Sequence, residues 1–215
     1  MKDTMCRIDP ATWDRAKIFE SYKEADLPYI FVTADLDVTN LYCYVKEQGV
    51  SFHFAFLYLA AKAANTIPNF HYRIIDGEVW WVEELVAVTT HLTKGSEHFI
   101  MSECLPYSDL VTYARENHAA AEAIKPGGNP RGIESRNDIL NCSAIPWISY
   151  TSFVRTIAHS GQDSNPKLTL GKYHWVQDRL LLPFSTQTHH GLMDGLHVGR
   201  FYERIQEMID EKMWG

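Results

Sequence analysis

A predicted strand that runs into a predicted helix through two adjacent histidines is the feature that most constrains this chain. Residues 179–188 read Arg-Leu-Leu-Leu-Pro-Phe-Ser-Thr-Gln-Thr, and their alternation of apolar and polar side chains predicts a half-buried strand. From Val198 to Ile209, apolar side chains recur every three to four residues, which is typical of an amphipathic helix. His189 and His190 follow the strand directly. A rigid strand can therefore direct one of the two rings into a cleft.

The composition is that of an ordinary globular protein. The 215 residues are 46% hydrophobic and 22% charged, and a chain of this length can bury a large core. The formal net charge of -7 argues against nucleic acid or an anionic membrane as the main partner, because like charges repel. The longest apolar run, residues 54–61, is far shorter than a bilayer span, and the N-terminus has no apolar run of signal-peptide length. We expect a cytoplasmic protein without a nucleic-acid or membrane partner.

Cysteines and histidines give no sign of a disulfide framework or a metal site. The cysteines are scattered and form no Cys-x-x-Cys pair: Cys6, Cys43, Cys104 and Cys142. They are expected to be reduced thiols of a cytosolic protein. His189, His190 and Asp194 would be a candidate metal set, but adjacent residues of an extended strand point to opposite faces. We therefore expect no metal.

Helix and strand patterns alternate along the whole chain. Strands are expected at residues 27–35, 72–75, 79–82, 86–92, 99–104 and 179–188, and helices at residues 11–25, 38–48, 52–66, 109–124 and 198–209. Residues 140–153 are interpreted as a strand pair or a bent strand, and residues 167–175 return to alternation. Asp76-Gly77 suits the type I′ turn of a hairpin. The sequence predicts one α/β domain, residues 1–215, built on a mixed sheet.

Local signals place the ends of several helices. Asp37, Ser51 and Ser108 are expected to cap the helices that follow them, because their side-chain oxygens can accept a first-turn backbone hydrogen bond. Gly49 is expected to end the first of these helices. The helix at residues 52–66 is apolar on nearly all sides, so we expect it to lie under the sheet.

The chemistry of the strand exit depends on His190 and Asp194. Imidazole has an ordinary pKa of about 6.5 and is the usual general base near neutral pH. Asp194 can orient the ring directly, or it can hold the turn by pairing with a cation elsewhere. Gly191 and Gly195 are expected to give the backbone conformational freedom there. The pattern alone is equally compatible with polar residues at a strand end.

Several segments, in order, resemble those of one enzyme family. Residues 189–200, His-His-Gly-Leu-Met-Asp-Gly-Leu-His-Val-Gly-Arg, resemble the signature of the chloramphenicol acetyltransferase family. Residues 13–15, 141–147, 168–173 and 178–185 are similar to that family's Trp-x-Arg, Asn-x-Ser-Ala-x-Pro-Trp and Thr-x-x-Lys-Tyr segments and to the strand before its histidines. Together they cover nearly the whole chain. The core motif alone is also similar to that of condensation domains and dihydrolipoyl acyltransferases.

The resemblance implies a two-layer sandwich of a mixed β-sheet and packed helices, in which an acetyl group passes from acetyl-CoA to an acceptor hydroxyl. The transfer would be direct, in a ternary complex without an acyl-enzyme. By this analogy His190 accepts the hydroxyl proton, a contribution of about 10²- to 10⁴-fold in rate. Ser143 donates to the oxyanion, where a lost donor costs roughly 3 kcal/mol, and Thr169 holds a water.

Further roles follow from the same resemblance. Asp194 is expected to pair with Arg15, and Lys172 and Tyr173 to lie near coenzyme A, where an ammonium can meet phosphate and a ring can pack on adenine. The family is trimeric, so a homotrimer with each site across a subunit boundary is implied. Without the resemblance, Arg15 would be interpreted as a surface charge, and Lys172 and Tyr173 as a strand residue and its neighbour.

The acceptor pocket departs from the family. Tyr22, Phe31 and Phe99 match aromatic positions of the family's antibiotic pocket. Pro130, however, stands where the family has phenylalanine, and Arg155 stands where it has leucine. A cation in a pocket built for a neutral amphenicol is costly to desolvate without a partner. We therefore hypothesise that the acceptor is either chloramphenicol or another hydroxyl compound, one that carries negative charge near Arg155.

Two other functions are compatible with parts of this pattern. A non-catalytic trimeric binding or assembly protein could keep the fold, although the retained His190, Ser143 and Thr169 argue for catalysis. Acyl exchange on a lipoyl or carrier-protein arm has no support from a swinging-arm segment in this sequence. An acyltransferase related to antibiotic resistance is the preferred interpretation.

Overall fold

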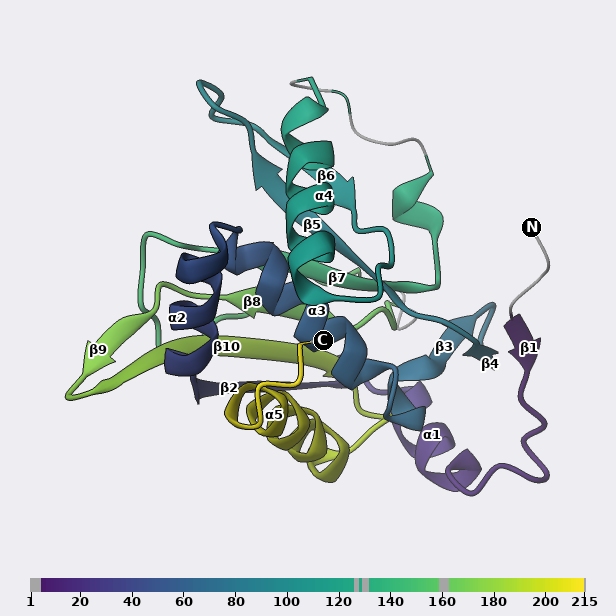
Figure 1. Cartoon of the computed structure of the whole chain (residues 1–215). Coiled ribbons are helices and arrows are strands. Elements are labelled where there is room, and N and C mark those ends of the chain that lie inside the picture. The colour runs from purple at the N-terminus through teal and green to yellow at the C-terminus, as the bar shows by residue number, and fades with distance from the viewer. Residues whose placement is uncertain (1–4, 126–127, 129–131, 159–162, 215) are drawn as a thin grey trace.

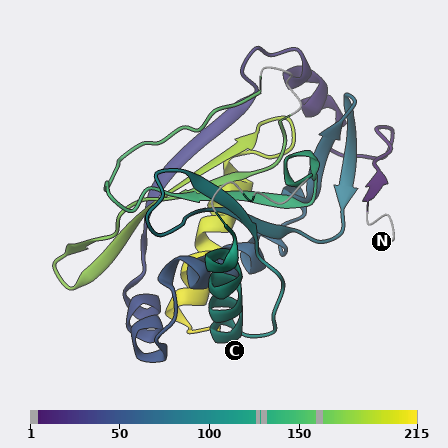
Figure 2. The ribbon, with the colours of Figure 1, turned by 90° about the horizontal axis from the view of Figure 1, so that it is seen from above.

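A mixed β-sheet with helices packed on one face forms the body of the protein (Figures 1 and 2). The computed structural model describes residues 5–125, 128, 132–158 and 163–214. In these residues a seven-stranded sheet has the order β2-β10-β8-β7-β5-β6, and β9 pairs with β10. Its strands are β2 (Tyr29–Asp37), β5 (Val86–Leu92), β6 (Phe99–Glu103), β7 (Ile139–Ala144), β8 (Lys167–Leu170), β9 (His174–Val176) and β10 (Arg179–His189). Only the β5/β7 and β7/β8 pairs of this sheet are parallel, so the expected mixed sheet is confirmed.

A small second sheet lies beside the first, and its strands are β1 (Met5–Arg7), β3 (Tyr72–Ile75) and β4 (Glu78–Val82). The turn between β3 and β4 has φ of 52° at Asp76 and 77° at Gly77. Positive φ at both central residues is what a type I′ turn requires, so the predicted hairpin is confirmed. The three residues of β1 escaped prediction, because so short a strand carries no periodic pattern.

The helices are α1 (Ala16–Lys23), α2 (Thr39–Gln48), α3 (Phe52–Ala64), α4 (Leu110–Ala123) and α5 (Gly195–Asp210), with short 3-10 turns at Pro68–His71 and Ile133–Ser135. Helices α2 to α5 cover one face of the large sheet (Figures 1 and 2). Helix α3 lies in the middle, where Phe54, Phe56 and Leu57 are almost completely buried, as its apolar surface predicted. The two-layer α/β fold is therefore confirmed.

The predicted helix ends are only partly correct. Gly49 ends α2 with φ of 64°, as expected. Asp37 is the last residue of β2, yet its carboxylate still accepts from the backbone N–H of Thr39 at 3.1 Å. Ser51 occupies the N-cap position without a side-chain cap. Asp109, one residue after the predicted cap, caps α4 instead, since a carboxylate is the stronger acceptor for an N–H.

Strand β10 is not half-buried as predicted, because both of its faces are covered. Ser185 and Gln187, expected to face solvent, are 4% and 5% exposed. The residues that cover them come from the segment 145–158, which was expected to be a strand as far as residue 153 but leaves the sheet after β7. Pro146 lacks the N–H that a ladder needs, which favours this exit. The backbone N–H of Arg155 then donates to Gln187 Oε1 at 3.1 Å.

Within the described part of the chain, no helix is both long enough and apolar enough to cross a membrane.

Candidate active site

The end of β10 presents two histidines in different environments. The His189 ring is 2% exposed, lies edge-to-face with Tyr29, and accepts the N–H of Gly191 at Nδ1, 3.1 Å away. The side chain of His190 is 27% exposed, and its ring stacks on Tyr22 with centroids 4.2 Å apart. Of the two rings, that of His190 is the one a substrate can reach.

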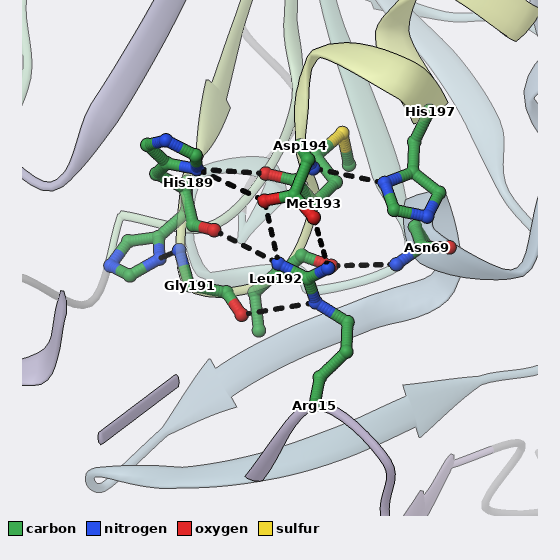
Figure 3. A network of polar contacts seen from close by, with 9 residues as sticks. Arg15, Asn69, His189, Gly191, Leu192, Met193, Asp194 and His197 are labelled. Carbon is green, nitrogen blue, oxygen red and sulfur yellow. Dashed lines mark hydrogen bonds and ion pairs between the residues drawn. The ribbon is translucent and has the colours of Figure 1, made fainter. Parts of the chain in front are cut away.

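Arg15 clamps the turn between β10 and α5 (Figure 3). Its guanidinium donates to both carboxylate oxygens of Asp194, at 2.6 and 3.1 Å, and to the carbonyls of His190 and Gly191, at 3.2 and 3.4 Å. Arg15 is 7% exposed, so this network is shielded from water on the arginine side. The hydrogen bonds from Arg15 lower the pKa of Asp194, which keeps the carboxylate ionised. Asp194 therefore pairs with a cation, one of the two roles considered for it, and it also lies 3.4 Å from the His190 ring, as the other role requires.

The contacts of His190 select one tautomer of its ring. Its Nδ1 lies 3.3 Å from the carbonyl oxygen of Met193 and 3.4 Å from Oδ1 of Asp194. A carbonyl and an ionised carboxylate only accept hydrogen bonds, so Nδ1 carries the proton. Nε2 then keeps its lone pair, which a general base requires.

Asn69 and His197 also hold the turn, and neither was predicted. Asn69 donates to the Leu192 carbonyl at 2.8 Å, and Nδ1 of His197 accepts the N–H of Asp194 at 2.9 Å (Figure 3). Asp194 and His197 form a reciprocal capping box at the start of α5. The Asp-x-x-His spacing could therefore have predicted this capping box, in which His stands in the place of the usual Glu or Gln. Asn69 is 123 positions from Leu192, and no local pattern marks such a contact.

Gly191 is required for a reason other than the expected one. A Cβ there would lie 3.1 Å from ring atoms of both His189 and Phe19, so only glycine lets the rings pack this closely. Its φ is not in the left-handed region, and neither is that of Gly195. At Gly195 a Cβ would meet nothing within 4 Å, so the expected need for conformational freedom is not observed.

Ser143 and Thr169 lie side by side on neighbouring strands. They are register partners in the β7/β8 pair, and Thr169 is opposite Ser185 of β10. The Ser143 hydroxyl lies 2.8 Å from that of Thr90, and Thr169 is 1% exposed. Ser143 thus stands in a row of hydroxyl side chains that crosses the sheet.

A single chain does not bring His190 and Ser143 together. His190 follows Ser185 by five residues, and Ser185 lies two strands from Ser143. With strand spacings of about 4.8 Å and a rise of about 3.3 Å per residue, the two Cα atoms are roughly 19 Å apart. No single small acceptor can touch both side chains within one copy of this chain.

Ser143 opens into a cavity of about 680 Å³, which also contacts Phe99, Arg155, His53, His91 and His118. Phe99 is 60% exposed. Tyr22 and Phe31 do not line this cavity, because Tyr22 lies against His190 and Phe31 lies on β2, opposite Gln187.

The remaining predicted positions differ in their surroundings. Lys172 is exposed, whereas the ring of Tyr173 packs edge-to-face on Phe52 at 5.2 Å and on Tyr42 at 5.4 Å. Arg155 is half-buried and donates to Asn141. Pro130 lies outside the described residues. Among the residues that the structure describes, no group of three or more His, Cys, Asp or Glu side chains is arranged to hold a metal ion.

Known proteins match this chain over nearly its full length. The family model for chloramphenicol acetyltransferase matches residues 4–206. Chloramphenicol acetyltransferase 3 of Escherichia coli is 32% identical over 211 residues, which cover 96% of this chain and 98% of that protein. Chloramphenicol acetyltransferase 2 of the same organism is 31% identical over 206 residues, covering 95% and 96%.

The chain belongs to the chloramphenicol acetyltransferase family.

Membership confirms the resemblance drawn from the sequence motifs, and with it the expectation of an acyltransferase. A solved structure of a chloramphenicol acetyltransferase superposes with a TM-score of 0.88 and 26% identity, over 95% of this chain and 99% of that one. A dihydrolipoamide acetyltransferase of Azotobacter vinelandii shares the fold at a TM-score of 0.65 and 19% identity.

Replacing Asp194 with Asn should destabilise the protein, because Arg15 would keep a buried charge without a carboxylate. Breaking a fully buried ion pair costs about 3–5 kcal/mol, and we expect about 2 kcal/mol here because the Asp194 side chain is 37% exposed. Urea unfolding at pH 7 measures the loss. The matched control is Glu207→Gln at the surface pair with Arg204, which should cost about 0.5 kcal/mol or less. Equal losses of unfolding free energy in the two variants would contradict a stabilising role of the Arg15–Asp194 ion pair.

His53 should make the protein acid-sensitive above the range in which carboxylates titrate. Burial, with smaller effects of His91 and His118, lowers its pKa from 6.5 to about 4. Above pH 6.5 the ring is neutral in both the folded and the unfolded state. Between pH 6.5 and about 4 the unfolded state binds a proton that the folded state does not, so the unfolding free energy should fall by up to about 1.4 kcal/mol per pH unit.

Denaturant unfolding from pH 7 to pH 4.5 measures this dependence. His53→Gln should flatten it, because the amide can hydrogen-bond to Thr89 as the ring does at 2.8 Å but does not titrate. His98→Gln, at an exposed position, is the control and should leave the dependence unchanged. If the unfolding free energy of His53→Gln depends on pH as that of the wild type does, the conclusion that His53 stays neutral in the folded protein is contradicted.

Proposed function

We propose that this protein transfers the acetyl group of acetyl-CoA to the hydroxyl of a small acceptor, with chloramphenicol as a substrate. The observation that carries the proposal is the position of the His190 ring at an accessible strand end, where its Nδ1 faces the Met193 carbonyl and the Asp194 carboxylate. These acceptors favour the tautomer with the proton on Nδ1 and the lone pair on Nε2. Relatives of similar length that are named chloramphenicol acetyltransferases support this reaction.

The proposed reaction is a direct transfer in a ternary complex. Nε2 of His190 accepts the proton of the acceptor hydroxyl as its oxygen attacks the thioester carbonyl, a contribution of about 10²- to 10⁴-fold. The tetrahedral oxyanion accepts a hydrogen bond from Ser143. Collapse of this intermediate breaks the carbon–sulfur bond, and the coenzyme A thiolate takes the proton from the imidazolium. The acetyl ester and the free thiol are the products.

The hydroxyl pair of Ser143 and Thr90 fits the oxyanion role. If Thr90 donates to the Ser143 oxygen across their 2.8 Å contact, the Ser143 proton points elsewhere and can meet the oxyanion. The neighbouring Thr169 is proposed to hold a water at the same place. Arg15 and Asp194 act at a distance, since their pairing fixes the loop that carries His190.

The roughly 19 Å between His190 and Ser143 in one chain supports a shared site. We propose a homotrimer in which His190 and Tyr22 of one chain face Ser143, Phe99 and Arg155 of the next. Phe31 is proposed to add an aromatic wall to the acceptor pocket. This arrangement would bring the Nε2 of His190 from one chain to the Ser143 cavity of the next.

Coenzyme A is proposed to enter beside Ser143, with Lys172 near a phosphate and Tyr173 near the adenine. Lys172 is exposed to solvent, where it can meet a phosphate. The ring of Tyr173 already packs on Phe52, so adenine would have to bind against the remaining surface of that ring. We place the reaction in the cytoplasm and treat residues 1–215 as one catalytic domain, with antibiotic resistance as one outcome of the activity.

Incubation with acetyl-CoA and chloramphenicol should release free thiol, which a thiol reagent measures continuously. His190→Ala should lower kcat by about 10²- to 10⁴-fold, since the base is lost. Ser143→Ala should lower it by about 10²- to 10³-fold, since an oxyanion donor is lost. His174→Ala, a histidine on β9, is the control and should keep full activity.

One result would contradict the proposal and favour a non-catalytic trimeric binding or assembly protein. In that case thiol release would be absent with every hydroxyl acceptor, and His190→Ala would behave as the wild type does.

A further inference from the structure

Arg155 lines two cavities. One is the cavity of about 680 Å³ that contains Ser143, and the other, of about 630 Å³, contains Lys167 and Asp163. Arg155, Phe99 and Thr90 contribute to both. The guanidinium is held at Asn141, which lines the second cavity, so a ligand that extends from the first cavity toward Asn141 meets this cation.

Neutral groups hold the Arg155 side chain in place. Nη1 donates to the Asn141 carbonyl and Nη2 to Asn141 Oδ1, both at 2.7 Å. Two neutral acceptors fix the orientation of the planar guanidinium but leave its charge uncancelled. Within the described residues, Arg155 makes no ion pair, whereas Arg136 pairs with both Glu103 and Asp138 at 2.7 Å.

Arg155, Lys167 and Asp163 line the second cavity and leave one positive charge in excess there, whereas Glu97 lines the first cavity. Asp163 is the neighbouring carboxylate, and it forms its ion pair with Lys167. Arg155 and Lys167 thus share one carboxylate. Burial lowers the pKa of Arg155, in keeping with a cation that has lost part of its hydration. A bound anion would restore the interactions that burial removes.

The rest of the first cavity is largely apolar. Phe54, Phe99, Trp147 and Phe153 contribute to its walls. His53, also in the wall, is neutral at pH 7 because burial lowers its pKa to about 4. The cavity therefore suits an amphipathic molecule, with an apolar body and its charge at the Arg155 end.

The distance from the cation to the reacting centre follows from β7. Asn141, which holds the guanidinium, and Ser143 are two residues apart on the same face of this strand. Their Cα atoms are therefore about 7 Å apart. An acceptor whose hydroxyl lies beside Ser143 would place a group about 7 Å away within reach of Arg155.

We propose that the preferred acceptor is an amphipathic hydroxyl compound that carries an anionic group, such as a carboxylate, about 7 Å from the reacting hydroxyl, and that Arg155 binds this group. The inference rests on the proposed function for the identity of the reacting hydroxyl. Arg155 is then a specificity-determining residue, since a site that holds an unpaired cation disfavours a neutral ligand that leaves it unpaired.

Binding of matched probes tests this inference without requiring turnover. The probes are a chloramphenicol analogue with a carboxylate in place of the nitro group, the N-succinyl analogue, and the methyl ester of each. Calorimetric titration of the full-length protein should show at least one carboxylate binding about tenfold to a hundredfold more tightly than its ester, as expected for a hydrogen bond to a charged group. Higher salt should reduce this preference.

Substitutions assign the preference to Arg155. Arg155→Leu should abolish the difference between carboxylate and ester, and Arg155→Lys should keep part of it, because the charge remains but the fork is lost. Arg204→Leu, at an exposed ion pair, is the control and should leave the difference unchanged. Circular dichroism and thermal unfolding should show that each variant is folded.

The inference is overturned if wild type binds both esters at least as tightly as the carboxylates, if it binds neither carboxylate, or if Arg155→Leu keeps the preference. These results are separable from failure of the proposed function. A protein that acetylates chloramphenicol through His190 yet prefers the esters keeps the reaction and loses the anion site. A protein that prefers a carboxylate yet never releases thiol keeps the anion site and loses the reaction.

Discussion

The candidate site depends on the four hydrogen bonds that the Arg15 guanidinium donates to the Asp194 carboxylate and to the carbonyls of His190 and Gly191. Arg15 comes from the chain just before α1, whereas its acceptors lie between β10 and α5, so this one side chain ties the two ends of the sequence together. The same carboxylate lies near Nδ1 of His190, and its own N–H is held by His197. Asp194, which Arg15 holds, therefore contacts both the His190 ring and the start of α5. Asp194 serves as an anchor here, and relay of a proton through it is unnecessary.

The sheet imposes the second constraint. Registers along β7, β8 and β10 fix the row of hydroxyls at Ser143, Thr169 and Ser185, and they fix equally the distance from that row to His190. Rotamer changes cannot close roughly 19 Å. In the proposed reaction, His190 and Ser143 can therefore act together only where two chains meet. Arg155 lines the same cavity as Ser143, and its guanidinium is held by Asn141 of β7, the strand that carries Ser143.

Much of this could be predicted from the sequence, where the signal was local. Asp76-Gly77 specifies its own turn, Gly49 ends its own helix, and the spacing from His190 to Asp194 marks the strand-to-helix turn. What failed involved contacts between distant segments. Ser185 and Gln187 are buried because residues 145–158 cross over β10, and no periodicity within β10 contains that information. Asn69 was missed for the same reason. The sequence around Arg155 also gave no sign that its partner is the neutral side chain of Asn141, 14 positions away.

Subunit complementation tests the central claim most directly. His190→Ala and Ser143→Ala chains, carrying different affinity tags, are co-expressed, and mixed oligomers are purified through both tags before thiol release is measured with acetyl-CoA and chloramphenicol. Each variant alone should be nearly inactive, whereas every mixed trimer should contain a boundary at which an intact His190 faces an intact Ser143, so activity should return. Mixed oligomers that form but stay as inactive as the parent variants would contradict a site shared between chains.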